Sequence, residues 1–197
     1  MPAAKRSSAW IETFSGVHFD LLKPKASMVR LVDIAHHLSL QCRFAGACRW
    51  FYSVAEHSCH VHDDLLELNV WWNWDKKAPA RRIALLAGLF HDSPEAYASD
   101  CPSPLKHTLR DFCAAESRIA GAVTAWLGIR PGWFEADVIK MADLAALNIE
   151  AHDLFAGHGE SWSLPVEPVC DWHVECWTPH RAEREFLQRA YALGVEK

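Results

Sequence analysis

The stretch Pro79-Ala-Arg-Arg-Ile-Ala-Leu-Leu-Ala-Gly-Leu-Phe-His-Asp-Ser-Pro94 predicts a central buried helix that ends in a histidine–aspartate pair. Proline suits the first turn of a helix, and apolar residues then surround the predicted helix on nearly all sides. These apolar residues are Ile83, Leu85, Leu86, Leu89 and Phe90. Because a proline disfavours the helical conformation in the residue before it, the helix should end or bend near Asp92 and Ser93.

Further helices are predicted on both sides of this stretch, from apolar residues that recur every three or four positions. They cover about residues 28–40, 53–68, 105–127, 133–155 and 179–193. The connecting segments are a short extended or hairpin-like element near residues 10–19, a loop at 41–48, a rigid non-helical passage at 101–104, and an irregular loop at 157–178. We find no repeat and no shift in composition, so we expect one all-α domain that spans residues 1–197.

Composition limits the classes of function. Half of the 197 residues are hydrophobic and 23% are charged, which is typical of a folded globular chain with its own core. The net charge of -5 argues against a broad basic surface, so polymeric nucleic acid is not expected as a partner. The sequence contains neither a GxSxG nucleophile elbow nor a GxxxxGK[ST] phosphate loop.

The cysteines and the amino terminus bear on the compartment. The seven cysteines are an odd number without a CxxC pair, so we expect reduced and mostly buried thiols. The first eight residues lack the apolar core of a signal peptide, and no segment approaches about 18 uninterrupted apolar residues. We therefore expect a cytoplasmic protein with no membrane partner.

Four residues form a candidate metal site: His57, His91, Asp92 and Asp143. Taken singly, His57 is more often a hydrogen-bonded core histidine, and Asp143 more often pairs with an arginine or caps a helix. Their order on three successive helical segments is harder to explain as core polarity. A mixed imidazole and carboxylate set suits one divalent zinc, cobalt, manganese or iron ion and leaves positions for water, which favours catalysis over scaffolding.

The sequence around these residues resembles the HD-domain phosphohydrolases. The matching text is Arg43-Phe44, Phe51-Tyr-Ser-Val-Ala-Glu-His-Ser58, Leu89-Phe-His-Asp-Ser-Pro-Glu-Ala-Tyr97 and Asp100-Cys-Pro-Ser-Pro-Leu-Lys106, together with Asp143. The resemblance covers about residues 34–153 and is strongest to a branch with bacterial 5′-deoxynucleotidases and phage-encoded dATP triphosphohydrolases. It implies a compact helical HD-domain fold, a divalent metal, a bacterial or phage-encoded source, and a homo-oligomer that is a dimer or larger.

The resemblance also implies roles for five further residues. Glu95 and Asp100 match acidic residues that handle protons and position the attacking water. Arg43 and Lys106 match phosphate-contacting positions, and Phe44 is a candidate contact for the sugar or base. The alternatives are a simple turn or helix-start carboxylate for the two acids, solvated surface charge for the two cations, and a core position for Phe44.

These roles predict a nucleotide phosphohydrolase. A water activated by the metal would attack the phosphorus of a 5′-monophosphate or of a triphosphate such as dATP, and a second, substrate-linked divalent ion is an option. Two alternatives stay open: an HD hydrolase of a signalling nucleotide or cyclic phosphodiester, and a non-catalytic nucleotide-binding metal protein. The connector Trp71-Trp-Asn-Trp74 lies outside the matching text, and core cover is its default interpretation, with base binding or a subunit contact as the alternatives.

Overall fold

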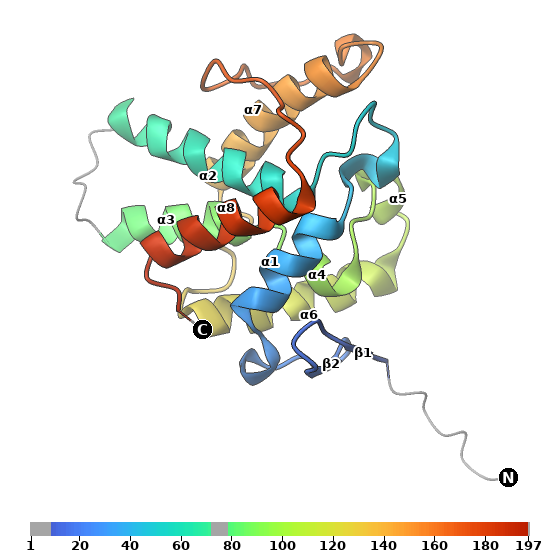
Figure 1. The fold of residues 1–197 in the computed structure, drawn as a ribbon, viewed down its shortest axis with the longest axis vertical. Coiled ribbons are helices and arrows are strands. Elements are labelled where there is room, and N and C mark those ends of the chain that lie inside the picture. The colour runs from blue at the N-terminus through green and yellow to red at the C-terminus, as the bar shows by residue number, and fades with distance from the viewer. Residues whose placement is uncertain (1–8, 72–78, 197) are drawn as a thin grey trace, which may run out of the picture.

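The computed structural model describes residues 9–71 and 79–196, and over these residues the chain is mainly helical (Figure 1). The α-helices are α1 (Leu31–Leu40), α2 (Val54–Trp71), α3 (Pro79–Phe90), α4 (Glu95–Ala98), α5 (Ser103–Lys106), α6 (Arg110–Leu127), α7 (Asp137–Leu154) and α8 (Pro179–Ala192). Short 3-10 turns are η1 (Ala26–Met28), η2 (Arg43–Gly46) and η3 (Glu160–Trp162). The predicted all-α fold is confirmed. Trp71 closes α2, and the rest of the predicted tryptophan-rich connector lies outside the described residues.

The end of α3 lies where the sequence predicts it. The last residue of α3 is Phe90, and the chain then turns through residues 91–94 before α4 begins. Both the backbone N–H and the hydroxyl of Ser93 donate to the carbonyl of Phe90, at 3.0 and 2.6 Å. This turn frees His91 and Asp92 from the regular helix, so both can point to one place.

The helix predicted over residues 105–127 is wrong at its start. The chain forms the short α5, leaves the helical region at Leu109, with φ −108° and ψ 76°, and only then begins α6. The hydroxyl of Thr108 donates to the carbonyl of Leu105 at 2.7 Å, and such local side-chain bonds compete with helix continuation. Ser103 and Pro104, predicted to be non-helical, instead form the first turn of α5, a position that proline tolerates well.

The predicted helix over residues 133–155 also begins later than expected. Helix α7 starts at Asp137, and Trp133 lies in a preceding turn in which its carbonyl accepts from the N–H of Ala136 at 3.2 Å. The position of Asp143 is unaffected, because it lies in the second turn of α7.

Helix α2 is the centre of the packing, since it contacts α1, α3, α7 and α8. Helices α2 and α3 approach closely at Gly88. A Cβ atom at this position would lie 2.2 Å from the Cδ1 atom of Leu65, far inside ordinary contact distance. The glycine therefore lets the two helices that carry His57 and His91 lie side by side.

The predicted hairpin-like element is an antiparallel pair of three-residue strands, β1 (Trp10–Glu12) and β2 (His18–Asp20). The backbone N–H and hydroxyl of Ser15 donate to the two carboxylate oxygens of Asp33 at 2.7 and 2.9 Å. The fully buried ring of Phe19 stacks on Tyr97, with centroids 3.8 Å apart. Through these contacts the hairpin packs against α1 and α4.

The segment at residues 157–178 is irregular apart from η3, as expected, and it packs against α2. The N–H of Trp177 donates to Glu56 at 2.7 Å, and the indole of Trp172 donates to Asp64 at 3.0 Å. Trp172 also stacks on His60, with ring centroids 4.0 Å apart. Trp172 and Trp177 of this segment therefore cover the polar face of α2.

Among the helices in the described part of the chain, we find none with the length and apolar character that a membrane crossing requires.

Candidate metal centre

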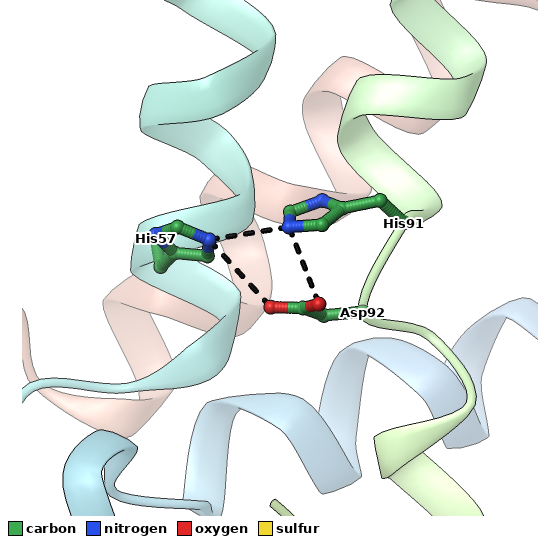
Figure 2. Close-up of side chains that lie close together, drawn as sticks. All are labelled: His57, His91 and Asp92. Carbon is green, nitrogen blue, oxygen red and sulfur yellow. Dashed lines mark hydrogen bonds and ion pairs between the residues drawn. The ribbon is translucent and has the colours of Figure 1, made fainter. Parts of the chain in front are cut away.

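Three predicted ligands meet at the junction of α2 and α3 (Figure 2). His57 projects from the first turn of α2, and His91 and Asp92 come from the turn after α3. The Nε2 atom of His57 lies 3.2 Å from Nε2 of His91 and 3.5 Å from Oδ2 of Asp92. The Nε2 atom of His91 lies 3.2 Å from Oδ1 of Asp92. Ligand atoms that each lie about 2.1 Å from one ion are about 3.0–3.4 Å apart, so this group could hold a metal ion.

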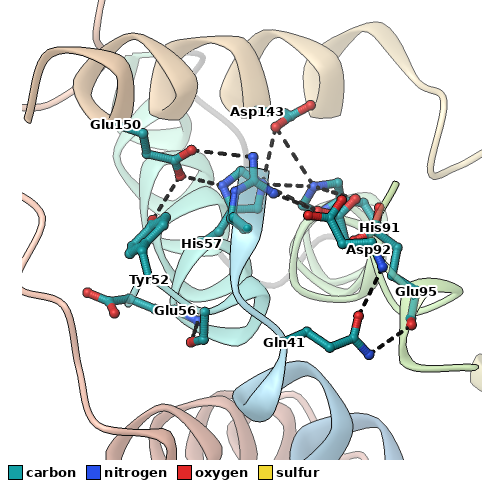
Figure 3. Close-up of polar contacts among 12 residues, drawn as sticks. Gln41, Tyr52, Glu56, His57, His91, Asp92, Glu95, Asp143 and Glu150 are labelled. Carbon is teal, nitrogen blue, oxygen red and sulfur yellow. Dashed lines mark hydrogen bonds and ion pairs between the residues drawn. The ribbon is translucent and has the colours of Figure 1, made fainter. Parts of the chain in front are cut away.

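The fourth predicted ligand, Asp143, reaches the same group from α7 (Figure 3). Its Oδ1 atom lies 3.2 Å from Nε2 of His57 and 4.0 Å from Nε2 of His91. The Asp143 side chain is 38% exposed, whereas that of His57 is fully buried. Asp143 therefore stands at the solvent side of the cluster.

Glu150 holds the ring of His57 in place. Its Oε1 atom accepts from Nδ1 of His57 at 2.6 Å and from the hydroxyl of Tyr52 at 2.8 Å, and all three side chains are buried. Burial opposes ionisation of Glu150, but Arg43 and His57 lower its pKa to about 2. An ionised carboxylate only accepts hydrogen bonds, so the proton on His57 resides at Nδ1 and leaves Nε2 to face the cluster.

The ring of His91 is oriented in the same way. Its Nδ1 atom lies 2.8 Å from the carbonyl oxygen of Gly88, which only accepts. The Nε2 atoms of His57 and His91 therefore face each other at 3.2 Å without a hydrogen available to either from a neutral ring. Two lone pairs at this distance repel unless a proton or a metal cation lies between them. Positive charge is therefore stabilised between the two ring nitrogens, whether a proton or a metal cation carries it.

Arg43 links the cluster to Glu150. One guanidinium nitrogen donates to Oδ2 of Asp92 at 3.1 Å, and the other lies 3.3 Å from Oε2 of Glu150. Burial opposes the charge of Arg43, but the nearby carboxylates Glu150 and Asp92 raise its pKa, so it stays cationic. The guanidinium thus lies directly beside a candidate metal ligand.

The charges of the cluster are strongly coupled to one another. Burial and Arg43 oppose protonation of His57, but Glu150 and Asp143 raise the pKa of His57 to about 9. Burial opposes ionisation of Asp92, but His91, His57 and Arg43 hold its pKa well below the ordinary range. The carboxylates therefore stabilise positive charge at the place where the ring nitrogens meet.

A pocket of about 220 Å³ opens beside the cluster. It is lined by His91, Asp92, Pro94, Glu95, Lys106, Cys113, Glu116, Ser117, Ala120, Phe134 and Glu135. It thus connects two candidate ligands with the first residues of α4, with the end of α5 and with one face of α6. This is space in which a small ligand can reach the cluster.

Glu95 is a buried carboxyl group in this pocket. Its side chain is only 8% exposed, and burial together with the charges of Asp92 and Asp100 raises its pKa well above the ordinary value. The backbone is fixed by Gln41, whose side-chain amide donates to the carbonyl of Glu95 and accepts from the N–H of Asp100, both at 3.0 Å (Figure 3). Glu95 is therefore a positioned carboxyl group whose surroundings favour its protonated form.

Lys106 also lines the pocket, but the structure gives it an acidic partner. Its Nζ atom lies 2.5 Å from Oε1 of Glu116 and 3.9 Å from Oε1 of Glu95. Asp100 is tied to Glu95 only through Gln41 and through its charge, and it is not among the pocket-lining residues. Of this predicted set, Glu95 and Lys106 thus share the pocket with His91 and Asp92, whereas Asp100 does not line it.

The ring of Phe44 contacts other aromatic rings and Arg43. Its ring packs edge-on against Phe155 at 5.0 Å and near Trp162 at 6.1 Å, and Arg43 lies 5.1 Å above it. These are packing contacts between the loop after α1 and the segment after α7. They support the packing alternative at least as well as the predicted sugar or base contact.

Sequence reasoning missed Glu150, Gln41 and Glu116. Glu150 follows Asp143 by seven residues, which is two helical turns along one face of α7, so the spacing does contain a signal. No comparable signal exists for Gln41 and Glu116, because their partners are distant in sequence.

Fold and site together define an all-helical protein with a His/Asp group that could hold a metal ion. The chain is 34% identical over 156 residues to the uncharacterized protein YfdR of Escherichia coli, and the aligned region covers 79% of this chain and 78% of YfdR. It is 31% identical over 161 residues to the uncharacterized protein RCAP_rcc00048 of Rhodobacter capsulatus, and the aligned region covers 78% of this chain and 76% of that protein. The chain belongs to the family of YfdR. A scan of protein-family models found no match.

Proposed function

We propose that this chain is an HD-domain phosphohydrolase that uses one divalent metal ion to release phosphate from a small nucleotide, with deoxynucleotides as the first candidates. The observation that carries the proposal is the convergence of His57, His91 and Asp92, with Asp143 beside them, at spacings that suit ligands of one ion. A second feature, which does not depend on a metal, also supports the proposal: a pocket with a buried carboxyl group opens beside this cluster.

The donor set fits a catalytic ion. Two imidazole nitrogens and carboxylate oxygens suit zinc, cobalt, manganese or iron, and the exposed side near Asp143 leaves room for solvent and substrate. A divalent ion at such a site lowers the pKa of water and neutralises charge on phosphoryl oxygens. We propose one resident ion.

The protein residues would divide the remaining tasks. The cationic Arg43 lies against Asp92 and is placed to attract phosphoryl oxygens that approach the cluster. Glu95, with its raised pKa, is placed to hold and pass a proton of the water or of the leaving group. Lys106 lies between the carboxyl groups of Glu95 and Glu116, reduces the repulsion between them and adds positive charge to the pocket.

The size and charge of the pocket favour a small substrate. A space of about 220 Å³ accommodates one part of a nucleotide beside the ion. The exposed carboxylate Glu135 at the pocket and the net charge of -5 disfavour a long polyanion such as DNA or RNA. We therefore propose mononucleotides, either 5′-monophosphates or triphosphates.

The test is a product assay on the purified full chain. The chain is loaded separately with manganese, cobalt or zinc and incubated with deoxy- and ribonucleoside mono-, di- and triphosphates, and products are separated by chromatography. We expect metal-dependent hydrolysis that is lost on chelation. Phosphate, pyrophosphate and triphosphate products each identify a different cleaved bond.

Two alternatives are separated in the same assay. Cleavage of a cyclic phosphodiester or a signalling nucleotide, with mononucleotides untouched, would overturn the substrate class but leave the hydrolase assignment. Nucleotide binding by calorimetry without turnover under any metal would overturn the hydrolase assignment and favour a binding protein.

A further inference from the structure

Two cysteines meet on either side of the turn that carries Arg43. The Sγ atoms of Cys42 and Cys48 lie 3.7 Å apart, and both side chains are partly exposed. Six positions separate them in the sequence, so the contact closes a short loop. Neither thiol takes part in the metal cluster or in the pocket beside it.

The backbone of this loop folds back sharply. Phe44, Ala45 and Gly46 have φ values of 58°, 51° and 77°, so three successive residues occupy the left-handed region. Only glycine adopts this region without cost, and a run of three turns the chain tightly enough to bring residues 42 and 48 together. The N–H of Ala47 donates to the carbonyl of Phe44 at 3.0 Å and closes the turn.

Both ends of the loop are anchored to other elements. Residue 42 pairs with Ser53 in an isolated antiparallel bridge, and the N–H of Arg43 donates to the carbonyl of Tyr52 at 2.8 Å. On the other side, the thiol of Cys48 donates to the carbonyl of Trp50 at 3.0 Å, and the N–H of Arg49 donates to the carbonyl of Leu154 at 3.0 Å. The thiols are therefore held near each other by the surrounding fold.

We propose that Cys42 and Cys48 form a reversible redox-modification site, in which a peroxide or a low-molecular-weight disulfide joins them into one disulfide around Arg43. With a peroxide, the Sγ atom of one cysteine gains an oxygen and becomes a sulfenic acid while the peroxide is reduced to an alcohol or water. The second thiol then attacks this sulfur, the S–S bond forms, the S–O bond breaks and water leaves. With a low-molecular-weight disulfide, one cysteine attacks the reagent, its S–S bond breaks, one reagent thiol leaves and a mixed disulfide forms; the second cysteine then attacks the protein sulfur of this mixed disulfide and releases the other reagent thiol. The two sulfurs move from 3.7 Å to the bonding distance of about 2.0 Å.

The surroundings of Cys48 bear on the order of the two steps. Burial and the hydrogen bond with Cys42 raise the pKa of Cys48 to about 11, so Cys48 is a protonated thiol at neutral pH. Because thiolates, not thiols, react with peroxide, the protonated state of Cys48 disfavours it as the first site of oxidation.

The position of this site couples it to the metal cluster. Arg43 follows Cys42 directly, and its guanidinium donates to Oδ2 of Asp92 at 3.1 Å. A covalent ring from residue 42 to residue 48 restrains the backbone of Arg43 whether or not the cluster is catalytic. The proposal therefore does not depend on the proposed function.

Peptide mapping tests the pairing directly. The reduced full chain is treated with hydrogen peroxide or, in parallel, oxidised glutathione, remaining thiols are alkylated, and the chain is digested with trypsin without reduction. Because trypsin cuts after Arg43 and Arg49, Cys42 and Cys48 fall on separate peptides that cover residues 31–43 and 44–49. We expect these two peptides as one cross-linked species, which dithiothreitol separates.

Three variants sharpen the result. The cross-link should disappear in Cys42→Ser and in Cys48→Ser, and it should persist in Cys176→Ser, which removes a third cysteine whose charge also acts on Cys48. Recovery of both peptides as alkylated free thiols from folded wild-type chain would overturn the proposal. So would a cross-link from Cys48 to the peptide with Cys176. The wild-type map decides even if a variant fails to fold.

Discussion

The Nδ1 atom of His57 lies 2.6 Å from Oε1 of Glu150, and neither side chain is exposed to solvent. This buried pair fixes which nitrogen of His57 carries the proton, and it aims the other nitrogen at His91, Asp92 and Asp143. The pair costs desolvation of a charge, which Arg43 and Tyr52 offset through their contacts with the same carboxylate. Such an arrangement is expected where a histidine must present one lone pair to a metal.

Replacement of Glu150 should weaken metal binding without removing a ligand. Glu150→Gln retains the size of the side chain but loses the charge that holds Nδ1–H of His57. We expect metal affinity to fall about 10- to 100-fold, as is typical for partners of metal-bound histidines. Competition titration against a chromophoric chelator measures this change.

Tyr52→Phe provides the matched control. It removes the hydrogen bond from the Tyr52 hydroxyl to the Glu150 carboxylate and leaves the bond between Glu150 and His57. We expect an affinity within about threefold of wild type, because the bond between Glu150 and Nδ1 of His57, which orients the ligand, stays in place. Equal losses in both variants would show that Glu150 acts only through general stability.

Asp143 should behave as a ligand although it is the most exposed member of the cluster. Its Oδ1 atom lies 3.2 Å from Nε2 of His57, which is the spacing of two ligands of one ion. Asp143→Ala should therefore lower metal affinity by at least tenfold while the circular dichroism spectrum stays helical. Unchanged affinity in Asp143→Ala would reduce the ligand set to the other three residues.

Glu95 should affect turnover and not metal retention. Glu95→Gln keeps the shape of the pocket but removes the proton-carrying carboxyl group, so we expect turnover to fall about 10²- to 10⁴-fold. Metal content, measured by elemental analysis, should equal that of wild type. Asp111→Asn on the exposed first turn of α6 serves as a charge-matched control and should keep full turnover. A fully active Glu95→Gln would rule out the proton role.

The ion pair of Asp63 and Arg189 should give the protein an acid-sensitive contribution to stability. The two groups meet at 2.6 and 3.0 Å and join α2 to α8. Burial opposes ionisation of Asp63, but hydrogen bonds from His62 and Arg189 lower its pKa from 3.8 to about 2. A lowered folded-state pKa stabilises the fold at pH values above the unfolded pKa, and this contribution disappears as the pH falls from about 4 to 2.

Asp63→Asn should therefore lower the melting temperature at pH 7 by about 1–4 °C, which corresponds to a contribution of about 0.5–1 kcal/mol from a pair whose acid is 42% exposed. The difference from wild type should shrink below about pH 4. Thermal melts monitored by circular dichroism at several pH values provide the measurement. A difference that stays constant down to pH 2 would contradict the assigned ion pair.

The sequence predicts the parts of this fold that depend on local pattern. Helical periodicity located α2, α3, α7 and α8, and Pro94 located the end of α3 to within two residues. The break before α6 was missed because apolar spacing continues through Leu109, while a local bond from Thr108 decides the backbone there. Local hydrogen bonds of this kind leave little trace in a hydrophobic pattern.

The sequence likewise predicts some residues of the candidate site and misses others. His57 and Asp143 interrupt apolar stripes of predicted helices, whereas His91 and Asp92 stand where Pro94 ends the central helix, and the structure brings the four residues together. Glu150 was missed because the sequence does not distinguish it from a surface acidic residue of α7, although its side chain is fully buried. The acidic partner of Lys106 depends on the packing of α5 against α6, which no short-range pattern contains.

X-ray absorption at the zinc or cobalt edge tests the central claim most directly, because it reports the ligand atoms of the bound ion. We predict one tightly held ion per chain, with two imidazole nitrogens at about 2.0–2.1 Å and oxygen ligands completing the shell. Asp92→Ala should lose this tightly bound ion. Sulfur ligands in the spectrum, or an unchanged spectrum and stoichiometry in Asp92→Ala, would contradict a metal centre built from His57, His91 and Asp92.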